Sequence, residues 1–128
     1  MTTEEYVKEA VKTNAGYYYY TDHELLHAAM GICTEAGEFM DAMKKCFAYG
    51  KVFDETNLQE ELGDLMWYIA LACHTLNVPL SYIMELNINK LKLRYPEKFS
   101  TEKALNRDLA AERVVLESGA KSCKTHNE

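Results

Sequence analysis

Hydrophobic and polar positions along this chain follow the period of amphipathic α-helices, and no stretch alternates with the period of two that marks a half-buried strand. Two prolines and six glycines are the only strong breakers. Their positions predict helices over about residues 3–13, 22–46, 54–76, 79–94 and 100–117. Residues that cap helix N-termini stand at most of these starts: Thr2 or Thr3, Thr21 with Glu24, Asp54 or Thr56, and Ser100.

The middle of the third predicted helix, residues 65–73 (LMWYIALAC), is apolar on every side. Such a helix must be covered on all sides, whereas a monomeric four-helix bundle of this size covers only one stripe of each helix. Either the last helix wraps it, or it lies in a subunit interface, and we favour the interface. The expected fold is therefore all-α and four-helix-bundle-like, with a short N-terminal helix, a C-terminal helix and an oligomeric state.

Composition adds limits on organisation. With 128 residues, 48% hydrophobic and 27% charged, the chain is expected to form one soluble domain over residues 1–117. Residues 118–128 have nothing to pack against and are expected to be a disordered tail. The net charge of −6 argues against nucleic acid or an anionic membrane as a partner.

Location is inferred from the same composition. The longest apolar run is about half of what a bilayer requires, and the N-terminal residues MTTEEYVKEA carry no signal-peptide pattern. The four cysteines form no CxxC pair, which favours reduced thiols over disulfides or a zinc site. We expect a cytoplasmic protein.

Two pairs of acids interrupt the apolar helices, Glu35 with Glu38 and Glu61 with Asp64. The i, i+3 spacing places each pair on one helix face. At 1.5 Å per residue, Glu38 lies about 12 Å before the end of its helix, and Glu61 lies about 9 Å after the start of the next. An antiparallel hairpin would bring both pairs to one level. The four carboxylates would repel one another unless Mg²⁺ or Mn²⁺ neutralised them.

Acids at this spacing more often form a solvated helix face. Glycines inside both motifs, Gly37 and Gly63, favour a site instead, because each costs about 1 kcal/mol relative to alanine in a helix. Such a glycine allows a close helix approach or leaves room for a ligand.

A polar stripe follows on the fourth predicted helix, where Asn87, Lys90 and Arg94 are spaced i, i+3, i+7. Cations near a helix C-terminus also interact favourably with the helix dipole. Beside a carboxylate metal site, however, the stripe supplies the fixed cations that a triphosphate needs.

Three motifs combine here: TEAGE at 34–38, ELGD at 61–64 and NINKLKLRYP at 87–96. Over residues 22–99 the chain resembles the MazG-like all-α nucleoside triphosphate pyrophosphohydrolases. That family usually opens the first motif with two glutamates, and Thr34 stands in place of the first. The resemblance implies cleavage of an NTP or dNTP between the α and β phosphates, giving the monophosphate and pyrophosphate. It also implies homodimers or homotetramers.

On this basis the expected metal ligands are Glu35, Glu38, Glu61 and Asp64, with Mg²⁺ or Mn²⁺ bridging the phosphates and activating a water. Glu38 is the catalytic residue expected to orient or deprotonate that water. The expected phosphate and nucleotide contacts are Asn87, Lys90, Arg94, Tyr95, Tyr68 and Trp67. The tyrosine run at 17–20 adds candidates for stacking on a base. A triphosphate is required, and deoxynucleotides or purines are expected to be preferred.

Two alternatives remain open. A di-iron carboxylate protein would use ExxH motifs, and residues 24–27 form one. However, Glu24 lies about 16 Å along the helix from Glu35, and a second ExxH is missing. We therefore expect His27 to be a packed or capping-region residue, and His74 to have a structural role. The other alternative is a helical interaction module whose acids bind only a structural cation, which would not need the polar stripe.

Overall fold

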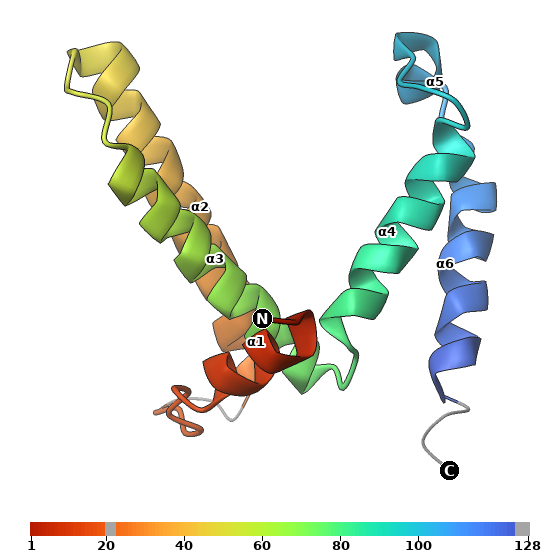
Figure 1. Cartoon of the computed structure of the whole chain (residues 1–128), viewed down its shortest axis with the longest axis horizontal. Helices are drawn as coiled ribbons and strands as arrows, with labels where there is room; N and C mark the ends of the chain where they lie inside the picture. The colour runs from red at the N-terminus through yellow and green to blue at the C-terminus, as the bar shows by residue number, and fades with distance from the viewer. Residues whose placement is uncertain (20–22, 125–128) are drawn as a thin grey trace. The chain divides into compact units, whose positions relative to one another are not determined.

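The computed structural model describes residues 1–19 and 23–124, and no strand occurs among them (Figure 1). The regular elements are α1 (Thr3–Val11), α2 (Glu24–Tyr49), α3 (Glu55–Thr75), α4 (Leu80–Arg94), α5 (Thr101–Leu105) and α6 (Leu109–Lys124). The predicted all-α fold class is confirmed. The chain divides into two compact units, an N-terminal unit (Met1–Pro79) and a C-terminal unit (Leu80–Glu128). The assignment of residues 1–117 to a single domain stays a prediction.

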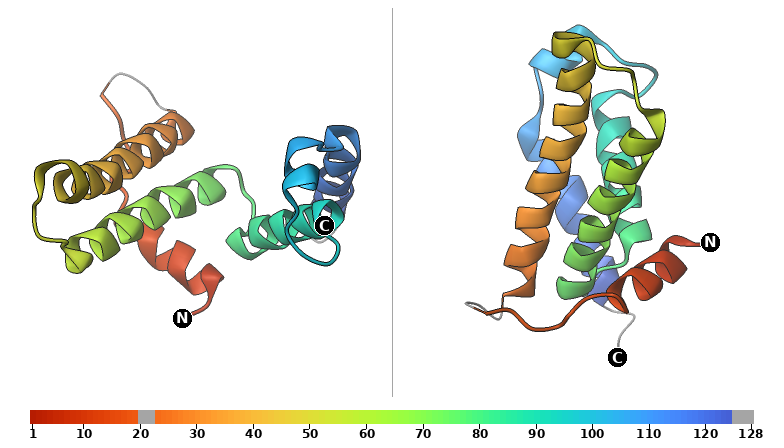
Figure 2. Two further views of the ribbon diagram at one scale, coloured as in Figure 1. Left: turned by 90° about the horizontal axis from the view of Figure 1, so that it is seen from above. Right: turned by 90° about the vertical axis from the view of Figure 1, so that its left-hand side faces the viewer.

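In the N-terminal unit, α2 and α3 form an antiparallel hairpin and lie side by side along their length (Figure 2). α2 ends at Gly50, whose φ of 64° is left-handed and suits a residue without a Cβ. After a short connector, the side chain of Asp54 accepts the N–H of Asn57 at 3.1 Å and caps α3. The end of α2 at Gly50 and the start of α3 at Asp54 define the antiparallel hairpin that was expected to bring the two pairs of acids together.

The two hairpin helices approach each other closely at Gly31. A Cβ added there would overlap the ring of Tyr68 on α3, so only glycine leaves room for the ring. The buried core of the unit comes from small and aliphatic side chains: Ala10, Ala28, Leu58, Ala70, Leu71 and Cys73. Of the described cysteines, Cys33, Cys46 and Cys73 are free thiols.

The short helix α1 packs against α3. It begins with the predicted cap: the Thr2 hydroxyl accepts the Glu5 N–H at 3.1 Å, while the Glu5 carboxylate accepts the Thr2 N–H at 2.7 Å. At its other end the indole of Trp67 donates to the carbonyl of Ala10 at 3.1 Å and to the hydroxyl of Thr13 at 2.8 Å. α1 therefore covers part of the apolar circumference of α3, a role that the sequence pattern does not indicate.

In the C-terminal unit, α4 and α6 run antiparallel and in contact (Figure 1). Their close approach is at Gly119, where an added Cβ would overlap the side chain of Leu86. α4 has the predicted bounds, and it ends at Arg94 just before Tyr95 and Pro96, as the restriction on a residue preceding proline requires.

The single last helix predicted over residues 100–117 is wrong. The structure has two helices in this region, because the helix is interrupted at Asn106. The side chain of Asn106 donates to the carbonyl of Glu102 at 3.0 Å. Asp108 then accepts the N–H of Ala111 at 2.9 Å, which is a new N-cap. α6 also continues to Lys124, so the helix does not end at residue 117, and residues 118–124 of the expected disordered tail are helical.

Some predictions fall on residues outside the described ranges. Tyr20, the capping residue Thr21 and Asp22 lie there, and α2 begins at Glu24. Among the described helices, none alone is both long and apolar enough to cross a membrane; α3 and α4 satisfy that test only when they are taken together across a break.

Candidate metal centre

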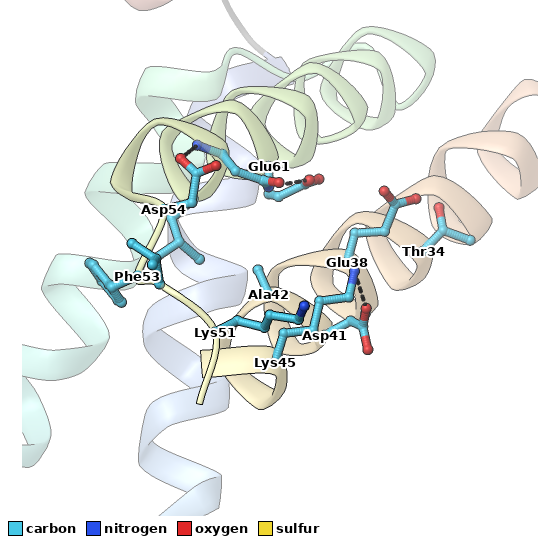
Figure 3. Close-up of a pocket in the computed structure, with 13 residues that line it drawn as sticks. Thr34, Glu38, Asp41, Ala42, Lys45, Lys51, Phe53, Asp54 and Glu61 are labelled. Carbon is cyan, nitrogen blue, oxygen red and sulfur yellow. Dashed lines mark hydrogen bonds and ion pairs between the residues drawn. The ribbon is translucent and has the colours of Figure 1, made fainter. Parts of the chain in front are cut away.

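Three carboxylates meet on the α2–α3 hairpin. Glu35 and Glu38 from α2 and Glu61 from α3 each offer one oxygen, and these oxygens lie within 4.8 Å of one another. Figure 3 shows Glu38 and Glu61 on the sides of the two helices that face each other. The sequence spacing thus brings three of the four acids of the two motifs together, as the hairpin geometry predicts.

Asp64, the fourth predicted ligand, lies outside this set of three oxygens. It is still close enough for its charge to act on Glu35 and on Tyr68, raising the pKa of both side chains. Three of the four predicted ligands thus form one cluster in this structure, and Asp64 as the fourth ligand stays a prediction.

The electrostatics of the cluster fit a cation. Burial, and next the charge of Glu38, raise the pKa of the Glu35 carboxyl, with smaller contributions from Asp64 and Glu61. A raised carboxyl pKa means that the surroundings disfavour the ionised form of the group. A bound cation would stabilise that ionised form. The donors are all carboxylate oxygens, the ligand type preferred by Mg²⁺ and Mn²⁺. The residues present therefore fit a hard divalent cation.

One residue that supports the cluster was missed in the sequence. Asn57, one helical turn before Glu61, donates its side-chain N–H to the Glu61 carboxylate at 2.8 Å and so fixes its orientation. The i, i+4 spacing of an amide and a carboxylate was the available signal.

A second missed residue is Tyr6 of α1. Its hydroxyl donates to the carbonyl of Gly63 at 3.5 Å, and both burial and the charge of Asp64 raise its pKa. Only the packing of α1 on α3 places it there, so no local pattern could have identified it.

The two motif glycines, Gly37 and Gly63, leave open space and do not lie at a helix contact. A Cβ added at Gly37 or at Gly63 would meet nothing within 4 Å in the described chain. The close approach of α2 and α3 is instead at Gly31. Of the two roles predicted for the motif glycines, open room beside the carboxylates is the one that fits.

The aromatic candidates separate into different environments. Tyr68 lies over Gly31, within the field of Glu35 and Asp64, and therefore borders the cluster. The indole N–H of Trp67 is directed toward α1, and its bonds to Ala10 and Thr13 explain the residue without a nucleotide.

His27 is packed, as predicted. Its ring lies 4.9 Å from the ring of Tyr18 and 5.4 Å from that of Tyr68, measured between centroids. Glu24, the acid of the same ExxH motif, accepts hydrogen bonds from Asn14 and Thr75 instead of joining the other acids. This arrangement gives the di-iron alternative no support.

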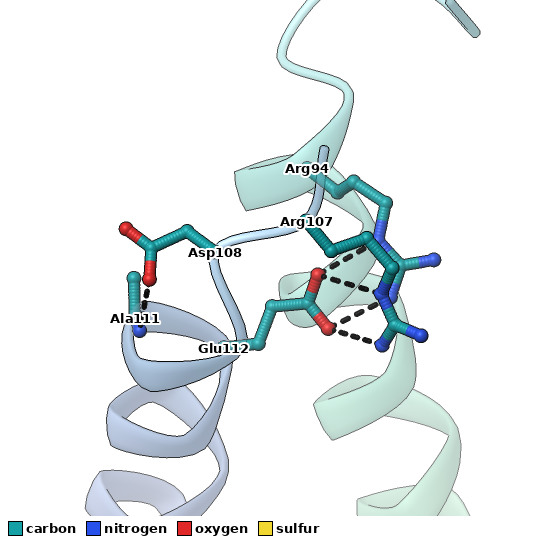
Figure 4. Close-up of polar contacts among 5 residues, drawn as sticks. All are labelled: Arg94, Arg107, Asp108, Ala111 and Glu112. Atoms are coloured by element: carbon teal, nitrogen blue, oxygen red, sulfur yellow. Dashed lines mark hydrogen bonds and ion pairs between the residues drawn. The ribbon is translucent and has the colours of Figure 1, made fainter. Parts of the chain in front are cut away.

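The polar stripe on α4 is only partly free. Arg94 has 15% of its side chain exposed, and it donates to both oxygens of Glu112 on α6, at 2.8 Å and 2.7 Å (Figure 4). Arg107 donates to the same carboxylate at 2.7 Å. These two guanidinium groups lower the pKa of Glu112 to about 2.

The other predicted nucleotide contacts of this unit are placed as follows. Asn87 is exposed and Lys90 is half-buried on α4. The ring of Tyr95 lies 5.3 Å from that of Phe99 and 5.6 Å from the guanidinium carbon of Arg94. Glu112, in the first turn of α6, was not singled out in the sequence, because an acid in an amphipathic helix gives no sign of its partner.

An all-α chain with a carboxylate cluster on a helical hairpin defines a class of helical proteins suited to binding a divalent cation. Within this class the family follows from comparison with known domains: residues 23–99 match the MazG nucleotide pyrophosphohydrolase domain, which is more than half of the chain. The protein belongs to this family, as the sequence resemblance indicated.

Among curated proteins, the chain is similar to the Gene 37 protein of Mycobacterium phage L5, with 40% identity over 74 residues. That match covers 55% of this chain and 65% of the phage protein, so the chain spans just under two thirds of its relative. No solved structure matches the chain.

Proposed function

We propose that this protein hydrolyses nucleoside triphosphates, with deoxynucleoside triphosphates preferred, to the monophosphate and pyrophosphate in the presence of Mg²⁺ or Mn²⁺. The observation that supports this most directly is the cluster of Glu35, Glu38 and Glu61 within 4.8 Å, in a chain that carries a MazG nucleotide pyrophosphohydrolase domain. We propose Asp64 as a further ligand, because its charge already acts on Glu35.

A bound divalent cation would supply positive charge that polarises a phosphoryl oxygen and offsets the charge of the departing pyrophosphate. The protein's own groups hold and position the reactants. Asn57 fixes the Glu61 carboxylate. Glu38 is exposed, and we propose that it accepts the proton of the attacking water. As the water oxygen bonds to the α phosphorus, the bond between that phosphorus and the bridging oxygen breaks, and the bridging oxygen leaves with its electron pair as part of pyrophosphate.

Contacts to the nucleotide remain part of the proposal. Tyr68 is supported as a neighbour of the base or sugar by its position beside Glu35 and Asp64. The motif on α4 supports phosphate contacts from Asn87 and Lys90, whereas Arg94 and Trp67 already have protein partners. Tyr95 stays a candidate on the motif alone.

The products test the reaction class. Incubation with a dNTP and Mg²⁺, followed by ³¹P NMR, should show the monophosphate and pyrophosphate in equal amounts. Release of orthophosphate with a nucleoside diphosphate would contradict the proposal, as would no turnover with any triphosphate. Removal of the cation with EDTA should abolish turnover, and added Mg²⁺ or Mn²⁺ should restore it.

A panel of the eight common NTPs and dNTPs, with the matching diphosphates, tests the substrate. Metal and phosphate contacts are shared by all triphosphates, so any preference must come from groups around the base. A hundredfold preference, about 2.7 kcal/mol, would indicate an enzyme dedicated to one nucleotide. A flat profile would indicate a general house-cleaning role, and equal turnover of diphosphates would contradict the requirement for a triphosphate.

We also propose at least a homodimer in the cytoplasm, with a homotetramer as the alternative assembly. Oligomerisation is supported by exposed apolar side chains on the hairpin, among them Met40, Leu62 and Met66. A nucleotide substrate and free thiols at Cys33, Cys46 and Cys73 support the location.

A further inference from the structure

A cavity of about 710 Å³ opens beside the carboxylate cluster, at the end of the hairpin where α2 passes into the connector. Glu38 and Glu61 form one part of its wall. Two lysines, Lys45 of α2 and Lys51 of the connector, line it as well (Figure 3). Neither lysine belongs to the motifs that the sequence singles out. Acidic ligand groups and basic side chains therefore share one hollow.

Lys45 is held toward the cluster by an ion pair. Its Nζ lies 2.8 Å from a carboxylate oxygen of Asp41, one turn back along α2. Asp41 is three residues after Glu38, about 4.5 Å along the helix axis. The hydrogen bond to Asp41, and next the charge of Asp41, raise the pKa of Lys45 most, and the charges of Glu38 and Glu61 add smaller contributions. The ammonium group is thus close enough to the acids for their charges to reach it.

Lys51 comes from the other side of the cavity. It follows Gly50, and its backbone N–H donates to the carbonyl of Lys45 at 3.1 Å, which ties the connector to the last turn of α2. Figure 3 shows its side chain reaching from the connector toward α2. The left-handed turn at Gly50 therefore brings a second ammonium group back to the cavity that Lys45 lines.

This juxtaposition has the charge pattern of a polyphosphate site. Carboxylates suit the cation that accompanies a triphosphate, and ammonium groups suit its remaining anionic oxygens. Arg94, the other basic side chain considered for phosphate binding, already donates to both oxygens of the buried Glu112. Lys51 lines the open cavity, and the ion pair of Lys45 with Asp41 is exposed to solvent.

We propose that Lys45 and Lys51 bind the β and γ phosphates of the substrate, with Asp41 positioning Lys45. This inference rests on the proposed function, since it assigns residues to the same site. It makes these two lysines the groups that distinguish a triphosphate from a monophosphate. Lys44 provides a matched control, because it also pairs with Asp41 but does not line the cavity.

The test measures binding and not turnover. Calorimetry with Mg²⁺ and a non-hydrolysable α,β-methylene deoxynucleoside triphosphate is run on the wild type and on Lys45→Met, Lys51→Met and Lys44→Met. We expect the first two variants to lose at least about tenfold in affinity, as for a charge-assisted hydrogen bond, and Lys44→Met to stay within about twofold of wild type. Affinity for the matching monophosphate should change less than about twofold in every variant.

The outcomes separate the two proposals. Unchanged triphosphate affinity in both Lys45→Met and Lys51→Met would overturn the inference, and so would an equal loss for triphosphate and monophosphate. A purely structural lysine would lower the unfolding temperature without changing affinity, which also contradicts it. Product analysis of the wild type stands apart from these results. If it shows no pyrophosphate release, the proposed function fails, whereas selective loss of triphosphate binding would still support the lysine site.

Discussion

At the scale of single residues, the carboxylates of the cluster repel one another, and a bound cation would reduce this repulsion. Burial and three neighbouring acids all raise the pKa of Glu35, and only the hydroxyl of Thr34 acts in the opposite direction. In the absence of a cation, removing one negative charge from such a cluster relieves repulsion. Binding a cation requires that same charge, so function and stability of the metal-free chain make opposite demands on the acids.

Glu61→Gln tests this opposition. The amide can still accept the hydrogen bond from Asn57, so the local structure is kept while the charge is removed. We expect turnover with Mg²⁺ to fall by about a hundredfold or more, and the unfolding temperature in EDTA to stay the same or rise. Glu60→Gln is the control, because Glu60 is exposed and outside the cluster. Near-normal turnover in Glu61→Gln would contradict a catalytic metal centre on these residues.

The parts of the site that sequence could predict are those fixed by helical spacing. Residues at i, i+3 share a face whatever surrounds them, and a short connector forces α2 and α3 to run antiparallel. That is why the meeting of Glu35, Glu38 and Glu61 was predictable. The spacing could not say that Trp67 turns to α1, because that depends on a donor finding the carbonyl of Ala10, far away in the chain.

At the scale of helices, the hairpin depends on one glycine without a role in the motifs. The ring of Tyr68 occupies the position that a Cβ at Gly31 would need. Gly37, two turns further along α2, has open space around it. The same substitution at these two positions should therefore have opposite effects on folding.

We expect Gly31→Ala to lower the free energy of unfolding by about 1–2 kcal/mol, since forced repacking exceeds the gain in helix propensity. Gly37→Ala should raise it by about 0.5–1 kcal/mol. Urea unfolding in EDTA, followed by circular dichroism, measures both without a contribution from bound metal. Equal effects of the two changes would mean that α2 and α3 do not meet at Gly31.

The error in the last helix shows what periodicity leaves out. Apolar positions continue through residues 100–117 in a helical rhythm, but Asn106 and Asp108 bond to nearby backbone groups and compete with the helix. Such local bonds interrupt a helix without changing the apolar pattern. Asp108, followed by an apolar run, was a start signal that the pattern of breakers did not include.

The pairing of α4 with α6 has a built-in pH dependence through Glu112, which is 4% exposed. Arg94 and Arg107 lower its pKa from an ordinary 4.5 to about 2 in the folded chain. A carboxyl whose folded pKa is depressed stabilises the fold above its unfolded pKa, and this contribution is lost as the pH falls from about 4.5 toward 2.

We expect Glu112→Gln to lower the urea midpoint clearly at pH 7, and to reduce the loss of stability that wild type shows between pH 4.5 and pH 2. Breaking a buried pair leaves Arg94 without its charged partner, which explains the cost at neutral pH. Glu117→Gln is the control, because its ion pair with Arg113 is exposed and should change stability by no more than about 0.5 kcal/mol. A midpoint in Glu112→Gln equal to that of wild type at pH 7 would contradict this role of the pair.

At the scale of the whole molecule, the apolar surface of the hairpin is larger than its own unit covers. α1 shields the side of α3 that carries Trp67, yet Leu62 and Met66, four residues apart on α3, are 49% and 40% exposed. Exposed apolar side chains gathered on one helix face favour an interface over a solvated surface. The preference for a subunit interface, which the apolar run at 65–73 suggested, keeps this support after α1 is taken into account.

Light scattering at micromolar concentration should therefore report at least twice the 14.7 kDa mass of one chain. Leu62→Lys combined with Met66→Lys should shift the protein toward one chain, because two buried ammonium groups at an apolar interface would lack partners. Val114→Lys introduces the same charge at another exposed apolar position, on α6, and should leave the mass unchanged. A wild-type mass of one chain would contradict the oligomer, and an unchanged mass in the double variant would place the interface on another face.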